Sequence, residues 1–162
     1  MIKWYVSVIH LRTELLKIVR CLNDANIDYG LVGGLAVAVH GYVRATRDSE
    51  ILIRHYDLAE ARNALLPICY DLDAGIFKFD QGTETETQLF RVSRADGPTL
   101  DLMLVTPILD EVWNSRETVK AYDTEIKVVS KAALIKMKEL AGRYQDLADI
   151  ESLRRISDSD DN

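Results

Sequence analysis

The chain has 162 residues, of which 48% are hydrophobic and 28% charged, and its formal charge is −6 with a pI near 5.1. These values are typical of one soluble globular domain, and a domain of this length needs neither disulfides nor structural zinc to hold a core. The acidic balance argues against broad, non-specific nucleic-acid binding but leaves room for a local basic groove.

Targeting signals and cysteines bear on the compartment in which the protein is expected. No apolar run approaches the roughly 20 residues of a membrane span, and the N-terminus lacks the features of a secretory signal, so we expect a cytoplasmic protein with no membrane contact. Cys21 and Cys69 have no Cys or His at metal-ligand spacing nearby. We therefore expect both to be buried thiols in a reducing compartment.

The first half of the chain alternates between helical and strand patterns. Apolar residues from Val8 to Leu22 recur at steps of three and four, which predicts an amphipathic helix. Gly41 is a candidate C-cap for the second helix. The predicted elements are a helix over 6–26, a strand from Asp28 into Gly33-Gly34, a short helix over Leu35–His40, a strand over Arg47–Arg54 and a helix over Tyr56–Pro67.

The second half is expected to be strands followed by helices. Turn signals separate three segments rich in β-branched and aromatic residues, which predicts successive, largely antiparallel strands. Ser130 is a candidate N-cap for the last helical region. The predicted elements are strands over Gly75–Asp80, Thr87–Arg94 and Pro98–Val105, a short helix over Leu109–Ser115, a strand or extended arm over Glu125–Val129 and a helical region from Lys131 to about Arg155.

This order of elements predicts an α+β domain with a mixed β-sheet flanked by helices and with helices at the C-terminus. We find no internal repeat, low-complexity tract or domain linker. Residues 1–156 are expected to form a single domain, and residues 157–162 an acidic, disordered tail.

A glycine pair follows the first predicted strand. Because Gly33 and Gly34 open a helix, their backbone amides are available to an anion such as a triphosphate. A Gly-Gly turn is also a common tight connection with no ligand. The pair is therefore informative only in combination with other motifs.

Three carboxylates carry the strongest chemical signal. Asp48 and Glu50 are one residue apart in a predicted strand, so they project from the same face, either as a solvated edge or as a cation site. Asp101 lies in an otherwise apolar strand, where a charge is costly unless it is paired, metal-bound or facing a cleft. If the two strands are neighbours, the carboxylates converge on a site suited to a divalent cation such as Mg²⁺, and one of them could accept a proton from an attacking hydroxyl.

The order of these motifs resembles that of the nucleotidyltransferase superfamily, which includes DNA polymerase beta. The matching features are an apolar residue before Gly33-Gly34, a spacer of 13 residues, Asp48-Ser49-Glu50 and a later Asp101 among apolar residues. The stretches Tyr29–Gly41 and Arg44–Asp48 look more narrowly like AbiEii toxin-type and minimal nucleotidyltransferase-like bacterial proteins. The segment Leu134–Leu153 is similar to the Lys and Arg-x-x-Asp-x-x-Asp helical motif of the same group.

The resemblance implies a nucleotidyltransferase fold and an enzyme that moves a nucleoside monophosphate from a nucleoside triphosphate, such as ATP, to an acceptor hydroxyl, with Mg²⁺ or Mn²⁺ as cofactor. It implies that Asp48, Glu50 and Asp101 bind metal and act in catalysis. The remaining implied roles are nucleotide or phosphate contacts from Gly33, Gly34, Arg47, Lys138 and Arg143, a catalytic contribution from Lys138, and orientation of these cations by Asp146. Lys138, Arg143 and Asp146 equally fit a helix surface with ion pairs at i,i+3 spacing.

One departure from the family pattern concerns activity. Ser49 stands where this group usually has an apolar residue, and Glu50 where Asp is commoner. Two functions follow as alternatives: an active nucleotidyltransferase, toxin-like or not, whose acceptor is an RNA end, a protein or a small molecule, and a catalytically weakened nucleotide-binding or regulatory protein. The second alternative includes one half of a toxin-antitoxin pair, with a cognate antitoxin or regulator as partner.

Overall fold

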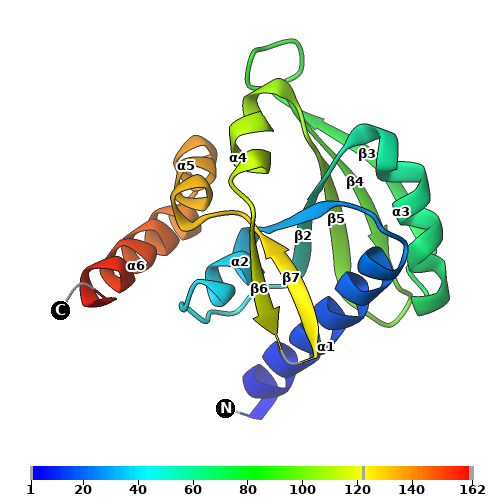
Figure 1. The fold of residues 1–162 in the computed structure, drawn as a ribbon, viewed down its shortest axis with the longest axis horizontal. Coiled ribbons are helices and arrows are strands. Elements are labelled where there is room, and N and C mark those ends of the chain that lie inside the picture. The colour runs from blue at the N-terminus through cyan, green and yellow to red at the C-terminus, as the bar shows by residue number, and fades with distance from the viewer. Residues whose placement is uncertain (1, 122, 161–162) are drawn as a thin grey trace.

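The computed structural model describes residues 2–121 and 123–160. These residues form a mixed sheet of seven strands with helices on both faces, as Figure 1 shows. The helices are α1 (Ile2–Asp24), α2 (Gly33–Val39), α3 (Leu58–Leu65), α4 (Asp110–Asn114), α5 (Lys131–Ala141) and α6 (Tyr144–Asp160). The strands are β1 (Tyr29–Val32), β2 (Asp48–Ile53), β3 (Leu72–Phe79), β4 (Thr87–Ser93), β5 (Thr99–Leu104), β6 (Glu117–Ala121) and β7 (Thr124–Val128).

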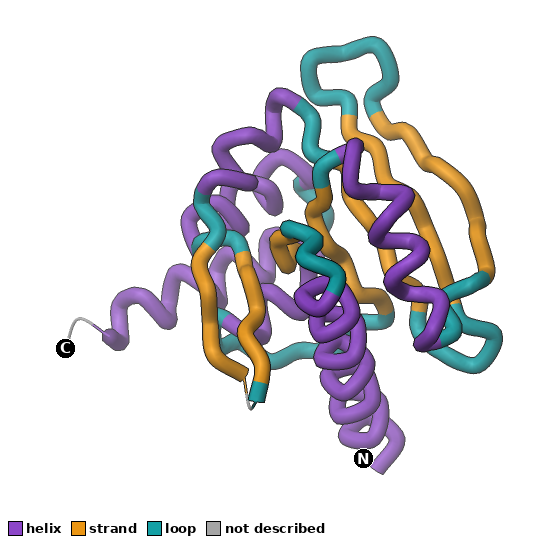
Figure 2. Tube along the Cα trace, turned by 45° about the vertical axis from the view of Figure 1, so that its right-hand side comes forward, coloured by secondary structure: helices purple, strands orange, loops and turns teal. Residues whose placement is uncertain are grey.

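The strand order is β3-β4-β5-β2-β1-β7-β6. Strand β2 pairs parallel with β5, and β1 pairs parallel with β7, whereas the other neighbours are antiparallel. The β6–β7 hairpin continues the sheet on the side away from β3, as the tube view in Figure 2 shows. The expected α+β class and mixed sheet are confirmed.

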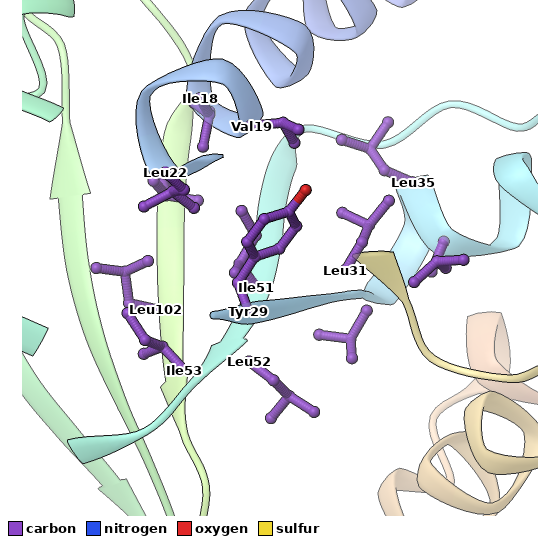
Figure 3. Close-up of a cluster of buried hydrophobic side chains, with 14 of the residues drawn as sticks. Ile18, Val19, Leu22, Tyr29, Leu31, Leu35, Ile51, Leu52, Ile53 and Leu102 are labelled. Atoms are coloured by element: carbon purple, nitrogen blue, oxygen red, sulfur yellow. The ribbon is translucent and has the colours of Figure 1, made fainter. Parts of the chain in front are cut away.

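The main core lies between the sheet and α1. Ile18 and Leu22 of α1 are fully buried and lie over Ile51 of β2 and Leu102 of β5 (Figure 3). Residues that alternate with these in the strands, such as Leu52, point to the other face of the sheet. The central strands β1, β2 and β5 are thus largely buried on both faces, and polar side chains there require partners.

Several element boundaries differ from the sequence predictions. Strand β6 was not predicted, because Glu117, Thr118 and Lys120 are exposed and give the segment little apolar alternation. Strand β3 begins at Leu72 and contains a register shift next to Gly75. The C-terminal helical region is two helices, because Gly142 adopts a φ of 64° and its N–H closes the last turn of α5 onto Lys138 O.

The structure also differs from the expectations for the cysteines and for the C-terminal tail. Cys69 is exposed where a buried thiol was expected, and Cys21 is half-buried. Cys69 follows the Leu66–Ile68 turn and has a left-handed backbone with a φ of 67°. Helix α6 continues to Asp160, so residues 157–160 are helical where a disordered tail was predicted, and residues 161–162 lie outside the described part of the chain. No Pro or Gly interrupts the segment after Arg155, so nothing in it stops the helix.

Within the described residues, no helix is long and apolar enough to cross a membrane.

Candidate active site

The face of the sheet opposite α1 carries the three predicted carboxylates. Asp48 and Glu50 share one face of β2, and the parallel register places Glu50 beside Asp101 of β5. Asp101 is 5% exposed, whereas Asp48 and Glu50 are half-buried. Burial raises the pKa of both Asp48 and Glu50, and repulsion from Asp101 raises each further. The structure therefore brings the three carboxylates together on one face of the sheet.

The Gly33-Gly34 turn wraps around the Glu50 carboxylate. Gly33 has a φ of 69°, and a Cβ added there would lie 1.7 Å from Glu50 Oε2. The backbone N–H of Gly34 donates a hydrogen bond to the Glu50 carboxylate. A Cβ on Gly34 would lie 2.7 Å from Thr46 Oγ1, so both glycines are needed for close packing. A protein carboxylate thus contacts the amide that the family resemblance assigns to a phosphate.

Asp101 is held by an arginine that the sequence analysis did not single out. Arg91 of β4 lies directly opposite Asp101 in the antiparallel register. Its Nε and one terminal nitrogen donate to the two Asp101 oxygens at 2.7 and 2.9 Å. The hydrogen bond to Asp101 raises the pKa of Arg91, and the charges of Asp48 and Glu50 act in the same direction.

Lys138 of α5 brings a positive charge to Glu50. It is 5% exposed and lies 2.7 Å from Asp149 and 3.3 Å from Asp146, both on α6 and both buried. The charges of Arg143 and Lys138 offset part of the rise in the pKa of Glu50. Asp146 thus contacts Lys138 and also Arg143, which lies 2.7 Å away.

Asp149 links α5 to the loop before β2. Arg44 donates two hydrogen bonds to its carboxylate, at 2.7 and 2.8 Å, while Lys138 approaches the same group. Burial alone would raise the pKa of Asp149, but hydrogen bonds from Arg44, Lys138 and Gln145 outweigh burial and lower it. Asp149 is the second Asp of the Arg-x-x-Asp-x-x-Asp motif in the sequence, although the sequence analysis assigned it no role.

A cavity of about 240 Å³ opens beside these residues. Its polar lining includes Glu50, Lys138, Arg143 and Asp146, next to Gly33. Apolar side chains form most of the remaining wall, and they include Met103, Ile108, Leu109, Leu134 and Met137. Thr85, in the β3–β4 connection, and Thr87, the first residue of β4, also line the cavity; the connection lies at the top of Figure 1. A ligand in this cavity would meet both signs of charge and an apolar surface.

Two further arginines, Arg47 and Arg54, flank the two ends of β2. Arg47 is exposed and is not among the cavity-lining residues, although its charge lowers the pKa of Asp48 against the larger effects of burial and Asp101. Arg54 lies at the far end of β2, where it pairs with Asp110 at 2.8 Å and stacks over Trp113. Arg47 therefore remains a candidate nucleotide contact, and Arg54 lies away from the site.

The donor set on this face fits a divalent cation in its chemistry. Hard cations prefer carboxylate oxygens, and Asp48, Glu50 and Asp101 supply them around a region of excess negative charge. Within residues 2–121 and 123–160, however, no group of three or more His, Cys, Asp or Glu side chains could hold a metal ion in its present arrangement. Both Asp101 oxygens bond Arg91 instead.

No protein-family model matches the chain, and no curated protein matches it significantly. Several solved structures share its fold. The lincosamide antibiotic adenylyltransferase LnuA, solved with lincomycin, is 19% identical with a TM-score of 0.64, and the match covers 89% of this chain and 96% of LnuA. An antigenic nucleotidyltransferase-like protein from Paracoccidioides brasiliensis is 20% identical with a TM-score of 0.56, covering 91% of this chain and 76% of that protein.

A further match is ANT(2'')-Ia, solved in complex with adenylyl-2''-tobramycin. Its sequence is 12% identical and its TM-score is 0.57, and the match covers 91% of this chain and 94% of ANT(2'')-Ia. The chain therefore has the nucleotidyltransferase fold, as the sequence motifs predicted.

Proposed function

We propose that this chain, on its nucleotidyltransferase fold, transfers a nucleoside monophosphate from a nucleoside triphosphate to the hydroxyl of a small molecule. The observation that carries this proposal is the arrangement around one cavity: Glu50 and Gly33 on one side, Lys138 and Arg143 on another. Asp48 and Asp101 lie on the same sheet face as Glu50. Carboxylates for a cation and cations for phosphate oxygens are what nucleotidyl transfer requires.

The side chains have distinct roles in this reaction. In it, the acceptor oxygen bonds to the α-phosphorus, the bond from that phosphorus to the bridging oxygen breaks, and pyrophosphate leaves. Lys138 and Arg143 face the cavity and would stabilise negative charge on the phosphate oxygens, while Asp146 holds both cations in place. Mg²⁺ or Mn²⁺ bound by Asp48 and Glu50 would neutralise further phosphate charge. A carboxylate on this face would take the proton from the acceptor hydroxyl.

Cavity composition favours a small-molecule acceptor. The apolar side chains that form much of the cavity wall suit a compact ligand with an apolar body and few polar groups. The net charge of −6 disfavours a large RNA, which needs phosphate-neutralising residues. Two proteins of similar fold were solved with lincomycin and with adenylyl-2''-tobramycin, which are small molecules.

The catalytically weakened alternative also has a specific observation in its favour. The Gly34 amide contacts Glu50, and Arg91 occupies both oxygens of Asp101, so two of the groups required for catalysis have protein partners. In that alternative the chain binds nucleotide without transferring it. The narrower likeness to AbiEii toxin-type proteins, with a cognate antitoxin or regulator, remains a prediction of the sequence.

Pyrophosphate release tests the proposal even while the acceptor is unidentified. Each of the four ribonucleoside triphosphates is supplied with Mg²⁺ and, in separate reactions, with a low-molecular-weight cell extract, with total tRNA or with no acceptor. We expect release that depends on the low-molecular-weight fraction and is lost in Asp48→Asn. Release with tRNA alone would make RNA the acceptor, and nucleotide binding without release in any reaction would favour the weakened alternative.

A further inference from the structure

Arg91 is held in place by two different contacts. Its guanidinium makes the paired hydrogen bonds to Asp101, and it lies 5.4 Å from the centre of the Phe77 ring on the neighbouring strand β3. The Asp101 side chain is 7% exposed, whereas that of Arg91 is 39% exposed. Arg91 therefore lies between a buried carboxylate and the solvent.

Arg91 also acts as the counter-charge for the whole carboxylate face. Asp48, Glu50 and Asp101 all interact favourably with it. Arg47 acts on Asp48, and Lys138 and Arg143 act on Glu50. A divalent cation carries twice the charge of this guanidinium and would interact more strongly with the same carboxylates.

A divalent cation and this guanidinium do not fit Asp101 together. Magnesium sits about 2.1 Å from its ligand oxygens, whereas the Arg91 nitrogens already lie within 2.9 Å of both Asp101 oxygens. An ion bound to Asp101 would therefore lie within a few ångströms of the guanidinium, and repulsion at that separation is strong in a partly buried site. One of the two cations has to move.

We propose that Arg91 and a divalent cation compete for Asp101, so that Arg91 is a positioning residue which sets the cation affinity of the site. When the cation concentration is low, Arg91 closes Asp101 and two carboxylates remain for the ion. When a cation binds, it displaces Arg91 and gains Asp101 as a third ligand. This inference rests on the proposed function only in taking the carboxylate face as a cation site.

Titration of the nucleotide-free protein with Mn²⁺, followed by the electron paramagnetic resonance signal of the free ion, tests the competition. Arg91→Gln removes the competing charge and is expected to bind Mn²⁺ at least about tenfold more tightly than the parent chain. Arg91→Lys keeps the charge but loses the paired geometry, so its affinity should lie between the two. Melting curves confirm that each variant is folded, and Arg91→Lys carries the test alone if Arg91→Gln does not fold.

Arg47→Gln is the matched control. It also removes one positive charge that acts on this face, yet Arg47 does not hold Asp101, so its affinity should rise less than about threefold. Equal effects of Arg91→Gln and Arg47→Gln would reduce the role of Arg91 to general electrostatics and overturn the competition.

Unchanged or weaker binding in Arg91→Gln would overturn it as well. Asp48→Asn then separates the two claims. If it abolishes Mn²⁺ binding while Arg91→Gln has no effect, the cation site stands and only the competition is wrong. If the parent chain and every variant bind no Mn²⁺, both the competition and the cation-dependent function fail.

Discussion

The carboxylate of Glu50 occupies the space that a side chain on residue 33 would fill. A Cβ built on Gly33 would lie 1.7 Å from Glu50 Oε2, and the backbone there has a φ of 69°. Because residue 33 also joins β1 to α2, the entry to that helix and the position of the carboxylate are fixed by one contact. Glycine is required at this position for two separate reasons.

Gly33→Ala is predicted to destabilise the chain more than a backbone effect alone explains. Gly75→Ala is the control, because Gly75 also has a positive φ, of 84°, but nothing lies within 4 Å of an added Cβ. Positive φ costs about 1–2 kcal/mol in each variant. The clash should lower the free energy of unfolding of Gly33→Ala by about 1–3 kcal/mol more, as measured by urea denaturation. Equal losses in the two variants would mean that Glu50 moves aside freely.

Ser49→Ala is predicted to stabilise the chain by about 1 kcal/mol. Ser49 is fully buried on the face opposite Glu50, and its hydroxyl has no hydrogen-bond partner among the described residues. Ser130→Ala is the control of opposite sign, because the Ser130 hydroxyl caps α5 by accepting the Ala133 N–H, and its loss costs about 1 kcal/mol. A loss of stability in Ser49→Ala would show that its hydroxyl has a partner.

Glu50→Gln is predicted to raise the melting temperature at pH 7. Burial and then repulsion from Asp101 raise the pKa of Glu50, so the ionised side chain destabilises the fold. This penalty is full above the raised pKa and vanishes below the ordinary value of 4.5, where the carboxyl is protonated in both the folded and unfolded states. Glutamine keeps an oxygen that can accept the Gly34 N–H.

The melting-temperature difference between Glu50→Gln and the parent chain should therefore shrink as the pH falls from 7 toward 4. Glu151→Gln, which alters an exposed pair with Arg155, should leave the melting temperature nearly unchanged throughout. A gain from Glu50→Gln that persists unchanged at pH 4 would mean that the penalty is not one of ionisation.

Asp149→Asn is predicted to loosen the packing of α6 and to lower the free energy of unfolding by about 3–5 kcal/mol, because it leaves Lys138 and Arg44 with a weaker partner at a buried position. Leu147→Ala, at an exposed position of the same helix, should change it by about 0.5 kcal/mol or less. Similar small effects in both variants would mean that the Asp149 network contributes little to stability.

The sequence predicts the local parts of this site better than the long-range ones. Asp48 and Glu50 share a face because strand side chains alternate, which follows from their spacing alone. The partnership of Asp101 with Arg91 depends on the register of β4 against β5, and no local pattern determines such a register. Asp149 lies between these cases, since its spacing from Asp146 was visible but its link to Arg44 was not.

The same distinction applies to the fold. Ser130 and Gly41 were predicted as helix boundaries from local chemistry, and the structure has Ser130 as N-cap of α5 and Gly41 two residues after α2 with a φ of 107°. Strand β6 was missed because its side chains are mostly exposed, and pairing with β7 determines its conformation. Cys69 was wrongly expected to be buried because its apolar neighbours in sequence do not reveal the turn that points it outward.

The most direct test of the proposed site is the rise in melting temperature that nucleoside triphosphate with Mg²⁺ produces in the parent chain and in Asp48→Asn. A ligand present at about 100 times its Kd stabilises the folded state by about 2.7 kcal/mol, which is a readily measured shift. We predict a shift in the parent chain and in Glu60→Gln, an exposed control, and no shift with EDTA or in Asp48→Asn. An equal shift in Asp48→Asn, or one that survives EDTA, would contradict the assignment of these carboxylates to a metal-nucleotide site.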